Sequence, residues 1–169
     1  GFYLPGPLVG KIAGNNLEIT LFATGVWMFC GVWITLLLLQ KLFAGYGSRK
    51  YLSIPLFVAF SGLDAIGSRL QGALSLRPAN LIRGGHIEWW AERYQFSSNT
   101  TLLHWVPQHA FPSWIGALLV LQIVRTRNNL YLLPIISLST LLWSPFAAVG
   151  VTLLALLLLI ASGLVSTFL

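Results

Sequence analysis

Residues 19–42, with the sequence ITLFATGVWMFCGVWITLLLLQKL, decide the fold class of this chain. Lys41, close to the end, is the only charged side chain in the stretch. As an α-helix the stretch would extend ~36 Å, which is enough to cross a bilayer hydrocarbon core of ~30 Å. We therefore predict a membrane-spanning helix here.

The composition of the whole chain extends this prediction beyond one helix. Hydrophobic residues make up 56% of the 169 residues and charged residues only 8%, with a mean hydropathy of +0.78. A soluble domain carries about 25% charged residues. Apolar runs such as LLALLLLIA do not alternate with polar residues, which favours helices over a transmembrane β-barrel. The sequence predicts an all-α integral membrane protein.

Hydrophobic segments and turn signals divide the chain into about five transmembrane helices within a single transmembrane domain, residues 1–169. The predicted spans are residues 19–42, 51–67, 113–124, 130–143 and 146–168. Two of them, 113–124 and 130–143, are expected to be short or broken, because proline interrupts helices. Pro107 and Pro112 would break the approach to the first of these two.

Residues 68–111 form the longest weakly hydrophobic region, which we predict to be an external loop. Within it, HIEWWAERYQF suits a short amphipathic helix lying in the membrane interface, with its aromatic rings at the level of the headgroups. The chain begins at Gly1, without methionine, in a stretch that looks like the end of a loop. We therefore expect it to be a fragment of a longer protein.

Charged residues predict the orientation. Two short loops on one side hold five cations, Lys41, Arg49, Lys50, Arg125 and Arg127. The other side also holds five, but more thinly spread, together with all four acidic residues. Dense positive charge at helix ends is typical of the cytoplasmic side, so we expect residues 64–111 on the periplasmic side of a bacterial cytoplasmic membrane. The net charge of +6 then indicates membrane lipids as partners, and no nucleic acid.

Two carboxylates are the candidate catalytic residues. Asp64 ends the second predicted span, and an acid at membrane depth is a functional hypothesis by default; the alternative is an interfacial pair with Arg69. Glu88, near His86, lies in the predicted interfacial helix. Carboxylates beside a histidine suit acid–base chemistry or a divalent metal ion, although this spacing matches no strong metal motif. The alternative is a solvated amphipathic helix.

Cationic and neutral polar residues are the candidate substrate-binding groups. Arg69 and Arg83 could hold a phosphate, since guanidinium groups match phosphate oxygens; contact with ordinary headgroups is the alternative. The stretch NTTLLHWVPQHAFPSW, residues 99–114, concentrates neutral polar side chains where the loop re-enters the bilayer. A cavity lined by it would suit a sugar, or its polar groups would only satisfy neighbouring helices. The candidates in this stretch are Asn99, His104, Gln108 and His109.

Three segments, FSGLDAIG, HIEWWAERYQFSSNTTLLHWVPQHAFPSW and LLWSPFAAVG, resemble parts of bacterial multi-pass membrane proteins of the GT-C glycosyltransferase type. The resemblance covers roughly residues 55–150. It implies a many-helix enzyme that uses a lipid-linked sugar, with its active site facing outward between an external loop and the helix ends. Asp64 and Glu88 correspond only by position to acids of a later external loop. In that family the acidic residue that acts as base or metal partner lies in the first external loop, which we expect to precede the fragment.

The resulting hypothesis is transfer of a sugar from a polyprenyl-phosphate donor on the external face. The alternative is a non-enzymatic helical subunit of a larger membrane complex, docking partners through its tryptophan-rich segment. A transporter is a weaker alternative, in which broken spans would mark a substrate route. Convergence of Asp64, Glu88 and His109 on one pocket would favour the enzyme.

Overall fold

The computed structural model describes residues 3–59 and 98–163. Every regular element within these residues is a helix, which confirms the all-α prediction for this part of the chain. The chain divides into two compact units. The first comprises Gly1–Ile54 and Val106–Leu169, and the second comprises Pro55–Trp105. Each unit is described by itself.

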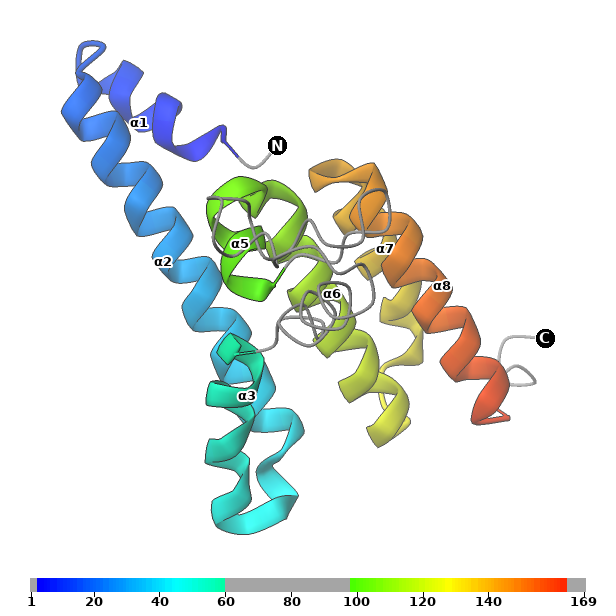
Figure 1. Ribbon diagram of the computed structural model, residues 1–169. Helices are drawn as coiled ribbons and strands as arrows, with labels where there is room; N and C mark the ends of the chain where they lie inside the picture. Colours follow the sequence, from blue (N-terminus) through cyan, green and yellow to red (C-terminus); the bar gives the residue numbers. More distant parts are fainter. Residues whose placement is uncertain (1–2, 60–97, 164–169) are drawn as a thin grey trace, which may run out of the picture. The chain divides into compact units, whose positions relative to one another are not determined.

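Helix α2, Leu17–Leu42, is the longest element of the first unit (Figure 1). It begins where the side chain of Asn16 accepts a hydrogen bond from the backbone N–H of Ile19 at 3.1 Å, as helix-capping residues do. Its most apolar window has a mean hydropathy of 2.0, and only 6% of that window is buried. Among the described residues this helix alone is both long and apolar enough to cross a membrane, as residues 19–42 predict.

Helix α1, Pro5–Ile12, folds back along the first turns of α2 (Figure 1). Gly6 and Gly10, one helical turn apart, are buried in this contact. A Cβ atom at either glycine would overlap the hydroxyl of Thr24 or Thr20 on α2. Each threonine hydroxyl donates at 2.8 Å to a carbonyl of its own helix, so it is satisfied without help from α1. The two helices approach closely because small residues face each other.

Helix α6, Pro107–Thr126, begins earlier than the predicted span 113–124. Pro107 is tolerated because the first helical residue needs no N–H donor within the helix. Pro112 lies inside α6, where it removes one backbone hydrogen bond without ending the helix. Residues 107–111, predicted as external loop, therefore belong to a helix.

Helices α7, Leu133–Trp143, and α8, Pro145–Ala161, form an antiparallel hairpin with only Ser144 between them. A 3₁₀ turn, η4 at Leu130–Leu132, precedes α7. Near the open end of the hairpin, side chains from three helices form a buried apolar cluster. Its members are Val120, Ile123, Leu133, Val151 and Ala155.

Two contacts join α2 to α6. The ring of Phe111, 1% exposed, packs against Gly31, where a Cβ atom would lie 2.9 Å from the ring carbons. At the carboxyl end of both helices, the Arg125 guanidinium donates to the carbonyl oxygen of Leu42 and lies 5.6 Å from the ring centroid of Tyr46. The two helices consequently run in the same direction.

Tyr46 belongs to η1, Ala44–Leu52, an irregular 3₁₀ segment that follows α2. It leads to α3, Ser53–Ala59, most of which lies in the second unit together with α5, Asn99–Trp105. The predicted span 51–67 is thus helical as far as it is described. Residues 60–67 lie outside the described ranges.

The described helices do not confirm the prediction of five full-length membrane spans. Besides α2, the described apolar helices are shorter, at Leu130–Trp143 and Pro145–Ala161, in the positions of the predicted fourth and fifth spans. Helix α6 has the length to cross a bilayer but carries polar residues in its first and last turns.

Replacing Gly10 with leucine is expected to release α1 from α2, because the new side chain would occupy the space of Thr20. Hydrogen exchange followed by mass spectrometry should show the backbone amides of residues 8–12 exchanging at least about tenfold faster, as expected when a locally packed helix opens. Gly25→Leu is the matched control, since the space beside Gly25 on α2 is open. Unchanged exchange in Gly10→Leu would contradict the glycine-mediated contact.

Candidate functional site

The first turn of α6 carries the two polar candidates that fall in the first unit. Gln108 accepts a hydrogen bond from the hydroxyl of Tyr3 through Oε1 at 2.8 Å, which links α6 to the segment before α1. His109 Nδ1 lies 2.6 Å from Oγ of Ser144, and its ring meets Phe146 edge-on at 5.7 Å. Both side chains are half-buried. The polar stretch therefore ties three segments that are distant in sequence.

Ser144 is the central group of this arrangement. It is fully buried, and its Oγ accepts the backbone N–H of Ala147 at 3.2 Å, which caps the start of α8. The same oxygen pairs with His109 Nδ1, and which of the two groups donates depends on the tautomer of the imidazole. We call His109, Ser144 and Phe146 the α6–α8 brace.

A serine hydroxyl beside an imidazole also resembles a nucleophile with its general base. Ser144 does not fit that role, because its side chain is 0% exposed and its oxygen already caps a helix. A substrate cannot reach this hydroxyl in the described conformation. The brace holds the hairpin against α6.

In the second unit, the candidate Asn99 and its neighbour Thr100 make hydrogen bonds to backbone. Asn99 Nδ2 donates to the carbonyl oxygen of Phe57 at 2.8 Å, and Thr100 Oγ1 donates to that of Val58 at 3.1 Å. These bonds join α5 to the end of α3. His104 is exposed near the end of α5. The Asn99 amide thus links the two helices, and its role in binding a substrate stays a prediction.

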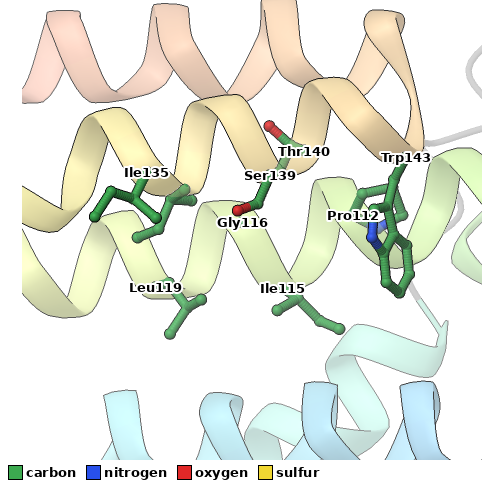
Figure 2. A pocket seen from close by; sticks show the side chains of 9 residues that line it. Pro112, Ile115, Gly116, Leu119, Ile135, Ser139, Thr140 and Trp143 are labelled. Atoms are coloured by element: carbon green, nitrogen blue, oxygen red, sulfur yellow. The ribbon is translucent and has the colours of Figure 1, made fainter. Parts of the chain in front are cut away.

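A pocket of about 240 Å³ lies between α6 and α7 (Figure 2). It is lined by Pro112, Ile115, Gly116, Leu119, Ile135, Ile136, Ser139, Thr140 and Trp143. Pro112 and Trp143 lie at one end and Ile135 at the other (Figure 2). Thr140 Oγ1 donates to the carbonyl of Ser137 at 2.8 Å, which leaves little polar recognition in the pocket. The lining suits an alkyl chain better than a sugar, and it includes none of the predicted sugar-binding side chains.

One buried donor lies close to this pocket. Trp27 of α2 packs on Trp143 with ring centroids 5.8 Å apart. Within the described part of the chain, its indole Nε1 is buried without an acceptor. Trp27 thus serves helix packing, as expected of a tryptophan inside a span. Trp33 on the same helix is 55% exposed and stacks on Phe29 instead.

The strongest catalytic and phosphate-binding candidates, Asp64, Arg69, Arg83, His86 and Glu88, lie outside the described residues. Their roles, and a divalent ion held by them, stay predictions. In residues 3–59 and 98–163, no three His, Cys, Asp or Glu side chains lie together as a metal site.

The opposite end of the first unit gathers the cations, as the loop sequences predict. The contacts of Arg125 with Leu42 and Tyr46 bring the carboxyl ends of α2 and α6 together with η1. We call this the basic end. Its cations are Lys41, Arg49, Lys50, Arg125 and Arg127.

Sequence reasoning missed Tyr3 and Ser144. Ser144 had a local signal, because serine followed by proline is a common start of a helix, and WSPF places the pair between two apolar runs. Tyr3 had none, since its partner Gln108 is 105 positions away.

Comparison of the sequence with protein-family models and curated proteins, and of the structure with solved structures, found no match.

Ser144→Ala is expected to destabilise the first unit by about 2 kcal/mol, because a lost helix cap costs about 1 kcal/mol and His109 loses its partner as well. Thermal unfolding in detergent, followed by circular dichroism, measures the change. Ser139→Ala is the control, since Ser139 is exposed on the neighbouring helix. Equal stability of the two variants would show that the brace does not stabilise the hairpin.

Proposed function

We propose that this chain is an integral membrane protein. The observation that carries the proposal is α2, a 26-residue apolar helix with few fully buried residues and large apolar side chains left exposed along it. Its exposed side chains include Phe22, Phe29 and Trp33, at 75%, 66% and 55%. Such a surface is unfavourable in water and is satisfied by lipid.

The proposed orientation follows from charge. The basic end faces the cytoplasm, because cations at helix ends are retained on that side. Glu18, at the start of α2, and the first turn of α6 then face outward. In a bacterial cell the outward side is the periplasm.

Single cysteines test this topology in a Cys30→Ala background. After carbonate extraction the chain should remain in the membrane pellet. In intact spheroplasts an impermeant maleimide should label Ala13→Cys, which lies beside the outer end of α2. Ser48→Cys, exposed in η1, should be labelled only after permeabilisation. The reverse pattern would invert the orientation, and release by carbonate would refute membrane integration.

We further propose a glycosyltransferase-like activity on the outward side. In this proposal Asp64 or Glu88 takes the proton of an acceptor hydroxyl. The acceptor oxygen bonds to the anomeric carbon of the sugar while the bond from that carbon to the phosphate oxygen breaks. The electron pair leaves with the polyprenyl phosphate, whose charge Arg69 and Arg83 stabilise. Support comes from the resemblance in sequence and from the number of carboxylates and arginines in the sequence of residues 64–93.

Asp64→Asn should lower sugar transfer in membranes at least about a hundredfold, the usual contribution of a general base. The assay uses radiolabelled polyprenyl-phosphate sugar and scores label released from the lipid. Glu18→Gln is the control, because Glu18 lies at the far end of α2 from η1 and in no proposed site. Unchanged transfer in Asp64→Asn would remove Asp64 from the mechanism.

A non-enzymatic helical subunit is the second candidate. It is favoured by the structural use of Asn99, Gln108 and His109, each of which bonds to another part of the chain. The exposed aromatic face of α2 is a surface that another helix would cover. Absence of transfer by the wild-type chain, with co-purification of a membrane partner, would favour this candidate.

A further inference from the structure

The basic end combines its five cations with exposed tyrosines. Tyr46 and Tyr51 in η1 are 55% and 60% exposed, and Tyr131 in η4 is 68% exposed. Both 3₁₀ segments lie at the end of the unit where α2 and α6 finish and α7 begins. Tyrosine, with an apolar ring and a polar hydroxyl, is enriched where a membrane meets water.

The cations at this end are placed to meet an external anion. Lys41, Arg49 and Arg127 are exposed. Arg125 is different, because its guanidinium is engaged by Leu42 and Tyr46 and so holds η1 against α6. Lys50 is half-buried, with Nζ 5.1 Å from the ring centroid of Tyr51.

The described residues provide no acidic side chain to neutralise this charge. Glu18 is the only acid within the described ranges, and it precedes Lys41 on the same helix by about 35 Å. At physiological salt that separation is several Debye lengths, so Glu18 exerts little influence on the basic end.

We propose that the basic end binds the phosphate groups of anionic phospholipids in the leaflet that it faces. This inference rests on the proposed membrane integration. It adds the class of lipid that the protein binds and the residues that bind it. A phospholipid suits the surface better than a free phosphate, because the tyrosines lie beside the cations and apolar helices begin directly behind them. The other four cations of the basic end contact the headgroups, while Arg125 positions η1.

Lipid selectivity at the protein surface tests the proposal. The full chain is reconstituted in phosphatidylcholine membranes with a trace of spin-labelled phosphatidylglycerol or spin-labelled phosphatidylcholine. Electron paramagnetic resonance then gives the fraction of each label that the protein immobilises. We expect about a fivefold preference for phosphatidylglycerol at low salt, the factor that corresponds to attraction by one cation.

The combined variant Lys41→Gln, Arg49→Gln, Lys50→Gln and Arg127→Gln should lose the preference, with its helix content unchanged by circular dichroism. Lys11→Gln, which removes a cation at the outer end, should keep it. Excess inorganic phosphate at constant ionic strength should leave the preference intact. Loss of the preference with phosphate would identify a free-phosphate site and overturn the proposal.

Equal binding of both lipids by the wild-type chain, or a preserved preference in the combined variant, would also overturn it. Failure of membrane integration gives a different result. In that case the chain is released by carbonate, whereas failure of the lipid proposal alone leaves it in the membrane without selectivity.

Discussion

Close approach of helix backbones at glycine is the constraint on which the first unit depends. The absence of side chains at Gly6 and Gly10 lets α1 pack closely on α2. At Gly31 the same absence leaves room for the ring of Phe111 from α6. Gly116 lets α6 contact the hairpin, since a Cβ atom there would lie 2.9 Å from Val151. In lipid, where apolar surface gains little by leaving its surroundings, tight packing replaces the hydrophobic effect as the source of helix association.

The brace and the basic end fix the two ends of this packed unit by different means. At one end, Ser144 caps α8 and also hydrogen-bonds the imidazole of His109. Its hydroxyl is therefore paired within the protein. At the other end most cations stay exposed. Among the described residues, exposed cations are therefore concentrated at the basic end.

Properties that depend on local composition could be predicted from the sequence. The helix over residues 19–42 follows from the length of the apolar run. The placement of Arg125 at the same end as the first basic loop follows from the positive charges at the helix ends. Pro112 shows where such reasoning fails, because a proline was read as a break although the helix tolerates the loss of one hydrogen bond. The contact of His109 with Ser144 joins residues 35 positions apart in the sequence. Periodicity and composition contain no signal for such a pair.

The unequal lengths of the helices have a mechanical consequence for a surrounding bilayer. Helix α2 extends about 39 Å, whereas α7 and its preceding 3₁₀ turn extend only about 22 Å. In the proposed membrane setting, lipid tails beside the hairpin must shorten or tilt while those beside α2 keep their full thickness. The bilayer would then be thinner beside the hairpin than beside α2. Headgroups of the outer leaflet would lie deeper there, close to the turn between α7 and α8.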